Sequence, residues 1–423
     1  MARGANRNGE TMREALITGM GIVSAVGDSL DQHRKALSAP VVNCNPVPAW
    51  LFDTTLEYPV FYARKELVDE IVLSTRPDFD LCCFYGMNRT MDLMLYALLH
   101  ALCDAGLDVW SLRDVRVGIA VGTTVGCTFN DEKYYDSWRR GEKSLPCPVL
   151  SYVSSNLASS MHDYLGTSGP SMVITNACAS GTDAIGLASD WIVSGLCDVA
   201  LAGGADELSR IAYNGFASLM LASESPCRPF DRRRNGLNLG EGSGMLVMES
   251  GEHLEATGRE RYLKGFSRGY GTASDAWHPT APHPGGRGLV SAVSAAMADA
   301  GLESLEDVAF INAHGTGTLA NDSAESEALV ALRADRLDVP VVSTKGMTGH
   351  TLGAAGAIEA ILTLLALEEG VLHGTAGCVE PDFSLSGKPL PQGEKARLEG
   401  RVAISQSLAF GGGNSAIVLE SVV

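Results

Sequence analysis

Apolar residues follow two spacings along the chain, one typical of buried strands and one typical of amphipathic helices. Short apolar and β-branched runs at 15–23, 115–121 and 199–206 predict strands with both faces covered. At 84–105 the apolar residues recur every three or four positions, which predicts a helix with one face in the core. Strands that alternate with helices favour an α/β fold. The other elements predicted in the first half are strands at 172–177 and 245–249 and helices at 30–36, 151–165 and 178–194, with Ser29 as the cap of the first helix.

The alternation begins again after a predicted helical link at 252–257. We therefore expect two similarly built halves, residues 12–258 and 259–423, that arose by duplication, although few residues are identical between them. The stretch 40–80 carries several prolines and little periodicity, and it predicts no regular element. The elements predicted in the second half are strands at 263–271, 308–313, 341–344, 402–405 and 415–419 and helices at 288–301, 323–337 and 353–367.

The composition supports this picture and disfavours some classes of partner. With 45% apolar residues among 423, the chain can bury a large core, and its 47 glycines indicate many tight turns between strands and helices. A formal charge of −18 disfavours binding to nucleic acid or to an anionic membrane surface. No apolar stretch approaches the roughly 18 residues that a membrane span requires, so we expect no such span.

The chain contains ten cysteines, and none of them forms a C-x-x-C pair or a zinc-like spacing with histidine. Reduced thiols in a cytosolic protein are the simplest account of this pattern. The polar segment 1–13 contains no apolar signal core, which also favours the cytoplasm.

Cys178 stands where the strand at 172–177 turns into the helix at 178–194. The free N–H groups and the positive dipole end of a helix favour a thiolate, so we expect a lowered pKa for this thiol. The neighbouring Ala177 and Ala179 are small enough to let a carbonyl group approach the sulfur. These are the requirements of a nucleophile, although a buried core cysteine is the alternative.

Three further stretches carry side chains that could face this thiol. His314 follows a predicted strand and precedes a run of glycines and threonines. Lys345 and His350 enclose a glycine-bearing loop before a predicted helix, and the turn 407–414 carries one aromatic residue among glycines. Each of these residues alone could be structural or solvated. Together with Cys178 they indicate thiol-based acyl chemistry.

A series of short motifs can be followed along the chain: Ala-Cys-Ala-Ser-Gly at 177–181, Ala-Gly-Gly-Ala-Asp at 202–206, Arg-Pro-Phe-Asp at 228–231, Gly-Glu-Gly-Ser-Gly at 240–244, His-Gly-Thr-Gly-Thr at 314–318, Asn-Asp at 321–322, Lys-Gly-Met-Thr-Gly-His at 345–350 and Phe-Gly-Gly at 410–412. In this order they resemble the β-ketoacyl-acyl-carrier-protein synthases of the type II, chain-elongating group, within the thiolase superfamily. The resemblance begins at about Met12 and is weakest at 40–80. It implies a thiolase-like, duplicated fold with layers in the order α/β/α/β/α.

The resemblance also implies a role for each principal site residue. Cys178 would take an acyl chain from a carrier-protein thioester, after which a malonyl thioester loses CO₂ and attacks the acyl-enzyme. The backbone N–H groups of Cys178 and Phe410 would form the oxyanion hole, and Gly411 would belong to the gating turn. His314 and His350 would face the malonyl group and donate hydrogen bonds to its enolate.

Five further residues have implied supporting roles. Lys345, with Glu359 as its ion-pair partner, would tune the electrostatic field around the imidazoles. Thr316 and Thr318 would hydrogen-bond the phosphopantetheine arm, which belongs to the carrier-protein substrate. Asp322 would anchor the loop after His314. The resemblance implies neither a resident cofactor nor a resident metal ion.

Two positions near the expected site depart from the family pattern. The family usually has glycine before the gating phenylalanine, whereas this chain has Ala409 there, preceded by Leu408. A Cβ restricts the backbone, so we expect an altered swing of this turn. Val125 stands where type II synthases often carry a bulkier isoleucine at the acyl pocket. A smaller side chain there could admit longer or stiffer acyl chains, with plain core packing as the alternative.

The basic docking patch common in the family is also altered. Arg76 is followed by Asp78 and Asp80, which places acidic charge where the carrier protein would bind. Arg139 and Arg140 are the substitute that we consider, although such a pair is also typical of a solvated face.

These observations predict an acyltransferase that elongates chains in fatty-acid synthesis or in a polyketide or polyene pathway. Its partner would be an acyl-carrier protein, and the family implies a homodimer or a heterodimer with a sister ketosynthase-like chain. The first alternative is a non-catalytic chain-length partner, but such subunits typically lack the cysteine that this chain retains as Cys178. The second alternative is a degradative thiolase, which uses a second cysteine where this chain has Phe410 and three glycines.

Overall fold

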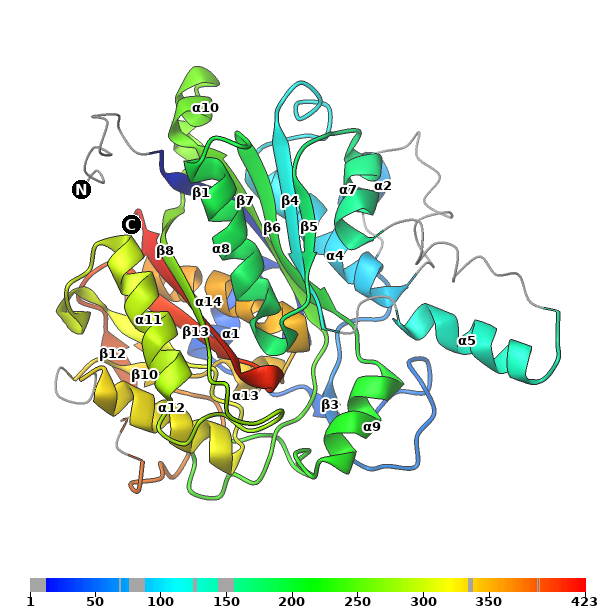
Figure 1. Ribbon diagram of the computed structural model, residues 1–423, viewed down its shortest axis with the longest axis vertical. Helices are drawn as coiled ribbons and strands as arrows, with labels where there is room; N and C mark the ends of the chain where they lie inside the picture. Colours follow the sequence, from blue (N-terminus) through cyan, green and yellow to red (C-terminus); the bar gives the residue numbers. More distant parts are fainter. Residues whose placement is uncertain are drawn as a thin grey trace.

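The computed structural model describes residues 13–67, 70–75, 88–124, 128–143, 156–333, 338–385, 387 and 389–423. Its largest sheet has ten strands in the order β10-β9-β13-β14-β8-β1-β7-β6-β4-β5. Figure 1 shows β6, β4 and β5 side by side at one end of this sheet. The strands of this sheet are β1 (Ala15–Val23), β4 (Val117–Gly122), β5 (Ser171–Ile174), β6 (Val199–Asp206), β7 (Gly242–Ser250), β8 (Gly265–Ser274), β9 (Phe310–Asn312), β10 (Val341–Val342), β13 (Val402–Leu408) and β14 (Gly413–Ser421).

The two ends of this sheet repeat one topology. From the centre outward, the first half runs β1-β7-β6-β4-β5 and the second runs β8-β14-β13-β9-β10. In each half the first two pairings are antiparallel and the last two are parallel. β1 and β8 join the halves by antiparallel pairing, with Ala15 opposite Ser267. The expected duplication is therefore confirmed, while the domain division between 258 and 259 stays a prediction.

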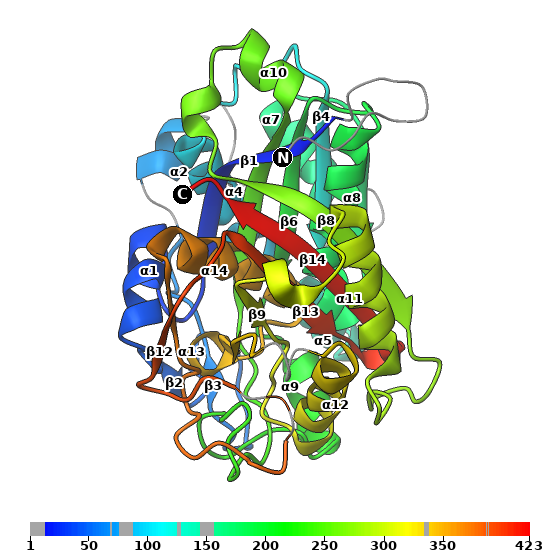
Figure 2. The ribbon, with the colours of Figure 1, turned by 90° about the vertical axis from the view of Figure 1, so that its left-hand side faces the viewer.

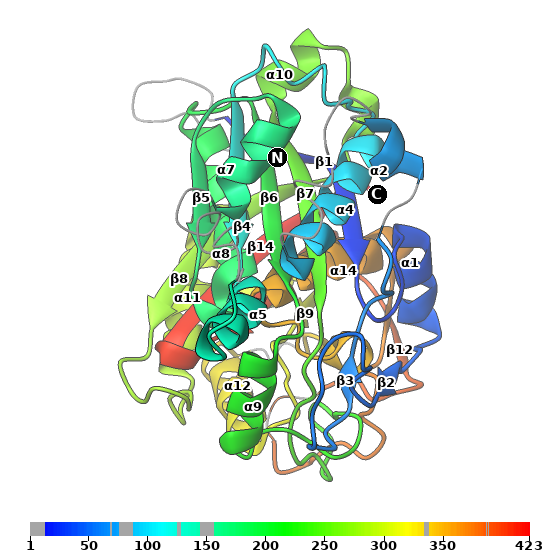
Figure 3. The ribbon, with the colours of Figure 1, turned by 90° about the vertical axis from the view of Figure 1, so that its right-hand side faces the viewer.

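Helices cover both faces of each half and fill the space between the halves. α8 (Ser180–Val193) and α14 (Ala355–Glu369) lie in the centre and contact strands of both halves. α4 (Arg89–Asp104) packs on β1 and β7, and α11 (Arg287–Ala300) packs on β8 and β14 (Figures 2 and 3). These elements form the thiolase-like α/β/α/β/α layers that the resemblance implies.

α14 is buried along nearly its whole length, and it approaches α8 closely at a glycine. A Cβ on Gly181 would lie 2.8 Å from both the backbone nitrogen of Ala357 and the carbonyl oxygen of Gly353. Only a residue without a side chain leaves room for such an approach. The contact fixes the first turn of α8 against the start of α14. Although α14 is apolar, no described helix combines the length and the apolar character needed to cross a bilayer.

Helix starts follow the capping residues more closely than the apolar pattern. α1 (Leu30–Ser38) begins after Ser29, whose side chain accepts a hydrogen bond from the N–H of Gln32, as predicted. Asn156 caps α7 (Leu157–Leu165) and Asn88 caps α4, so both helices start after the residues first assigned to them. The predicted helical residues 84–87 and 151–155 lie outside the described residues.

α12 (Leu319–Ala331) begins four positions before the predicted start at Ser323. The side chains of Asn321 and Asp322 in its first turn are buried: Asp322 accepts a hydrogen bond from the N–H of Gly317 in the preceding loop, and Asn321 donates to Glu325 within the helix. The spacing of apolar residues did not predict several short elements. These are α2 (Glu70–Thr75), α5 (Thr128–Arg139), α9 (Arg210–Ser218), α13 (Lys345–Thr348), β2 (Cys44–Asn45), β3 (Val60–Phe61), β11 (Val371–His373) and β12 (Lys395–Arg397).

Candidate active site

Cys178 lies in a short 3₁₀ turn, η1 (Ala177–Ala179), between β5 and α8. Ala177 has φ +44°, a conformation that residues with a side chain rarely adopt. The Ser180 hydroxyl accepts from the N–H of Asn176 at 2.8 Å and donates to the carbonyl oxygen of Ala177 at 2.6 Å. These bonds hold the sharp turn that places the buried thiol at the start of the helix.

The two histidines are fixed by their backbones. His314 follows β9, and its N–H donates to Glu325 on α12 at 2.7 Å, while the N–H of Gly315 donates to the same carboxylate at 2.6 Å. His350 follows α13, and its N–H donates to the carbonyl oxygen of Asn238 at 2.8 Å. Each imidazole therefore projects from an anchored loop.

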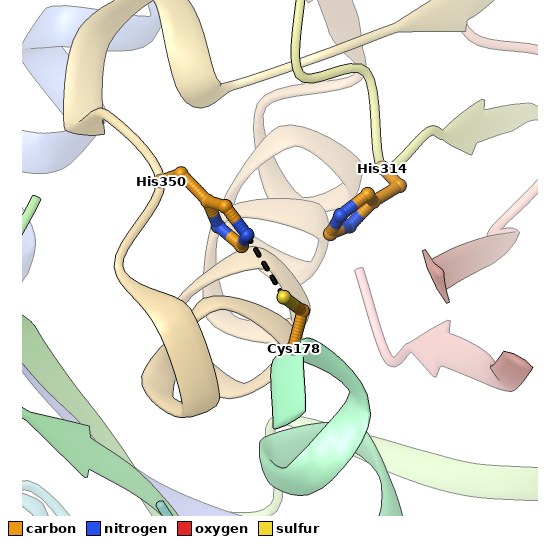
Figure 4. A group of neighbouring side chains, drawn as sticks. All are labelled: Cys178, His314 and His350. Atoms are coloured by element: carbon orange, nitrogen blue, oxygen red, sulfur yellow. Dashed lines mark hydrogen bonds between the residues drawn. The ribbon is translucent and has the colours of Figure 1, made fainter. Parts of the chain in front are cut away.

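The structure brings Cys178, His314 and His350 together (Figure 4). Nε2 of His350 lies 3.0 Å from Sγ of Cys178, within hydrogen-bond distance. The two imidazole rings lie 5.1 Å apart between centroids, at an angle of 87°. One sulfur and one nitrogen of each ring all lie within 4.8 Å of one another. This is the cluster expected from the sequence.

The cluster opens into a cavity of about 170 Å³. Apolar side chains and a few polar groups line it, which is typical of a site for a ligand with an apolar part. The predicted site residues in its lining are Cys178, His314, Thr316, Thr318, His350 and Phe410.

Lys345 is not a loop residue, because it begins the helix α13, and only 1% of its surface is exposed. Its Nζ lies 3.2 Å from Nδ1 of His314 and pairs with a carboxylate oxygen of Glu359, as the resemblance implies. An ammonium group can only donate, so Nδ1 of His314 must accept. His314 then carries its proton on Nε2, which leaves that nitrogen as the hydrogen-bond donor of the ring.

Both imidazoles are neutral near pH 7. Burial lowers the pKa of His314 well below its usual value, and the Lys345 charge and His350 act in the same direction. Burial and the Lys345 charge likewise lower the pKa of His350. Burial also raises the pKa of Glu359 to about 7, against the opposing effect of Lys345. Neutral imidazoles can donate to or accept from a substrate without carrying charge themselves.

The pKa of the Cys178 thiol differs from the one expected from the sequence. Burial raises the pKa of Cys178 to about 12, although the Lys345 charge and a hydrogen bond from the backbone of Phe410 act to lower it. The prediction of a lowered pKa is wrong, because the loss of hydration outweighs the field of the helix N-terminus. The resting residue is therefore a thiol, and Nε2 of His350 stands where it can accept the thiol proton. Nδ1 of His350 has no hydrogen-bond partner among the described residues, so either ring nitrogen can carry the proton.

The turn after β13 is built around Phe410 and Gly411. Gly411 has φ +84°, and its N–H donates to the carbonyl oxygen of Pro279 at 2.7 Å. Ala409 has an extended backbone (φ −127°, ψ 151°), so its Cβ adds no torsional strain in this conformation. The Phe410 ring stacks on Phe216 with centroids 5.2 Å apart. Sequence reasoning missed Phe216, because it lies on the unpredicted helix α9.

Asp322 is buried and accepts hydrogen bonds from the N–H groups of Phe230, at 2.8 Å, and Gly317, at 3.1 Å. These two hydrogen bonds anchor the loop after His314, which is the role that the resemblance implies for Asp322. The hydroxyl oxygens of Thr316 and Thr318 lie 3.0 Å apart at the cavity. Glu325, which holds the same loop, was missed, since a glutamate in a helix gives no sequence signal of burial.

Several predicted residues cannot be placed at the site. Val125, Arg76, Asp78 and Asp80 lie outside the described residues. The proposed substitutes for the docking patch lie at the end of α5 and already have partners: Arg140 pairs with Glu142 at 2.9 Å, and Arg139 lies 5.9 Å from the Tyr135 ring.

A duplicated five-layer fold with a thiol at a helix start and two facing imidazoles defines an acyl-transfer site of the thiolase type. Residues 12–253 match the family model described as beta-ketoacyl synthase, N-terminal domain, and residues 265–379 match the C-terminal domain. The chain therefore belongs to the β-ketoacyl synthase family.

Relatives and solved structures agree with this assignment. The chain is 32% identical over 430 residues to 3-oxoacyl-[acyl-carrier-protein] synthase 2 of Vibrio harveyi, covering 97% of this chain and 99% of the relative. It is 37% identical over 423 residues to nodulation protein E of Rhizobium meliloti strain 1021, covering 97% and 100%. The ishigamide ketosynthase/chain length factor structure superimposes with a TM-score of 0.85 at 30% identity, covering 97% of this chain and 100% of that chain.

Proposed function

We propose that this protein condenses an enzyme-bound acyl chain with a malonyl group carried by an acyl-carrier protein, with loss of CO₂, to give a 3-oxoacyl-carrier thioester. The observation that carries the proposal is the meeting of Cys178, His314 and His350 at one cavity. A thiol supplies the acyl acceptor, and two neutral imidazoles supply donors for an enolate without a metal ion.

The first half-reaction transfers the acyl chain to Cys178. Nε2 of His350, 3.0 Å from the sulfur, accepts the thiol proton as Sγ attacks the thioester carbon. The backbone N–H groups of Cys178 and Phe410 stabilise the oxyanion. The carrier thiol leaves and takes up the proton, so the products are the acyl-enzyme and a free carrier thiol.

The second half-reaction forms the carbon–carbon bond. Loss of CO₂ from the malonyl thioester leaves an enolate, whose oxygen accepts hydrogen bonds from Nε2 of His314 and of His350. Once the sulfur is acylated, His350 can carry its proton on Nε2. The enolate carbon attacks the acyl carbon on Cys178, and the released sulfur takes up one proton. Lys345 keeps His314 in the required tautomer, and Glu359 balances its charge.

The same cavity offers hydrogen-bonding groups to the arm of the substrate. Thr316 and Thr318 line the cavity, and we propose that they hydrogen-bond the phosphopantetheine arm of the carrier protein.

We propose a dimer, either of two copies or with a sister chain. Two structures similar to this chain are a ketosynthase/chain length factor and a ketosynthase in complex with its chain length factor. We place the protein in the cytoplasm, where its nucleophilic thiol stays reduced.

The test compares condensation by the wild type, Cys178→Ala and Cys197→Ala, with a panel of acyl-carrier thioesters and malonyl-carrier thioester. Cys197 is also buried but lies beyond the opposite end of α8, so its variant controls for loss of a core thiol. We expect the control to form product and Cys178→Ala to form none. Condensation by Cys178→Ala at the wild-type rate would exclude this nucleophile.

A further inference from the structure

We propose that Cys178, His314 and His350 also form a binding site for Zn²⁺ or a similar borderline-soft divalent cation, and that the cation inhibits the protein by occupying the site. Thiolate sulfur and neutral imidazole nitrogen are the ligands that Zn²⁺ prefers in proteins. The binding is independent of the proposed function, whereas the inhibition rests on it.

The spacing of the three ligand atoms suits a small cation. In a tetrahedral zinc site with Zn–S of about 2.3 Å and Zn–N of about 2.0–2.1 Å, neighbouring ligand atoms lie about 3.3–3.6 Å apart. Here Nε2 of His350 lies 3.0 Å from Sγ of Cys178, and the ligand atoms of all three residues lie within 4.8 Å of one another. Side-chain shifts of about 1 Å would complete the geometry. Figure 4 shows both rings directed at the sulfur.

The site also has room for a fourth ligand. The three residues line the cavity of about 170 Å³, far more than the roughly 30 Å³ that one water molecule occupies in the liquid. Three protein ligands with an open fourth position are typical of zinc sites that exchange their outer ligand. A cation held there would occupy the sulfur and both imidazoles, which are the groups that the condensation requires.

The positive charge of Lys345 opposes binding of the cation. The Lys345 ammonium lies 3.2 Å from Nδ1 of His314, and Glu359 offsets its charge. Binding of Zn²⁺ to Cys178 releases the thiol proton to solvent. For Nε2 of His314 to bind as well, its proton must move to Nδ1, and Lys345 must turn its N–H groups toward Glu359. We therefore expect Cys178 and His350 to be the stronger ligands and His314 the weaker, and we expect binding to be reversible by chelators.

The experiment measures metal binding without any acyl substrate, so that failure of the site and failure of the proposed function are distinguishable. Co²⁺ is titrated into the full-length protein while the near-ultraviolet thiolate-to-cobalt absorption is recorded, and bound Zn²⁺ is measured by equilibrium dialysis. The variants are Cys178→Ser, His350→Ala and His314→Ala. Cys103→Ser, at an exposed cysteine in the last turn of α4, is the matched control.

We expect the wild type and the control to bind one cation per chain at this site with the thiolate absorption, and Cys178→Ser to lose that absorption. His350→Ala should weaken binding by at least the about 10–100-fold that loss of an outer-shell partner costs. His314→Ala should weaken it less. Unchanged absorption in Cys178→Ser, or unchanged affinity in both histidine variants, would overturn the site. The inhibition is tested in a separate condensation assay with both thioesters, and full activity at a Zn²⁺ concentration that fills the site would overturn it.

Discussion

The close approach of α8 and α14 at Gly181 gives the most direct way to disturb the site without removing a reacting group. In Gly181→Ala the new Cβ would lie 2.8 Å from the backbone of both Ala357 and Gly353. Ordinary contact begins near 3.4 Å, so the two segments must separate by about 0.6 Å. Overpacking of this kind costs about 1–3 kcal/mol of stability.

The same separation should reduce activity. Cys178 stands three positions before Gly181, and its sulfur must stay within hydrogen-bond distance of His350, now 3.0 Å away. A misplacement of about 1 Å can cost about 100-fold in rate, so a shift of about 0.6 Å should cost about tenfold or more in condensation rate. Gly215→Ala is the matched control, because its Cβ would meet nothing within 4 Å on the exposed face of α9.

The assays are urea unfolding and steady-state condensation on both variants. We expect Gly181→Ala to lose stability and activity together. Gly215→Ala should keep its activity and gain about 0.5–1 kcal/mol, since alanine replaces glycine inside a helix. If Gly181→Ala unfolded at the wild-type urea concentration and condensed at the wild-type rate, the packing of the two helices would not be what positions the thiol.

Three further predictions concern single contacts. Lys345→Met should lower the free energy of unfolding, measured in urea, by about 3–5 kcal/mol, because it leaves Glu359 buried without its partner. The double variant Lys345→Met/Glu359→Leu should recover much of that loss. Equal stability of the single and the double variant would contradict the role of the pair. Alkylation of Cys178 by iodoacetamide should speed up about tenfold per pH unit from pH 7 to 9, since a pKa near 12 leaves little thiolate; a flat profile would reveal a resting thiolate. Phe216→Ala removes the ring that stacks on Phe410, and it should raise the rate of alkylation by opening the turn; an unchanged rate would show that the stack does not control access.

The architecture was largely predictable from the sequence because its signals are local. The strands β1 and β6 have the bounds that their apolar runs predict, and α1 begins after the predicted cap Ser29. The repeated alternation also predicted the duplication. It could not show that the halves share one sheet through β1 and β8, because strand pairing between distant segments leaves no periodic mark.

The site was predictable in its residues but less so in its physical state. Motifs identified Cys178 and both histidines, yet the thiol pKa depends on burial, which no motif records. Glu325 and Phe216 hold or cover the site from α12 and α9, and neither stands in a recognisable pattern. The possible zinc ligands come from three distant segments, so a search for zinc-like spacing could not find them.

The central claim is that the sulfur of Cys178 is the atom that receives the acyl chain. The most direct measurement is peptide mapping by tandem mass spectrometry after the wild-type protein is mixed with an acyl-carrier thioester in the absence of malonyl thioester. We predict an acyl group on Cys178 that disappears when malonyl-carrier thioester is added. An acyl group on any other residue, or one on Cys178 that malonyl thioester does not remove, would contradict the claim.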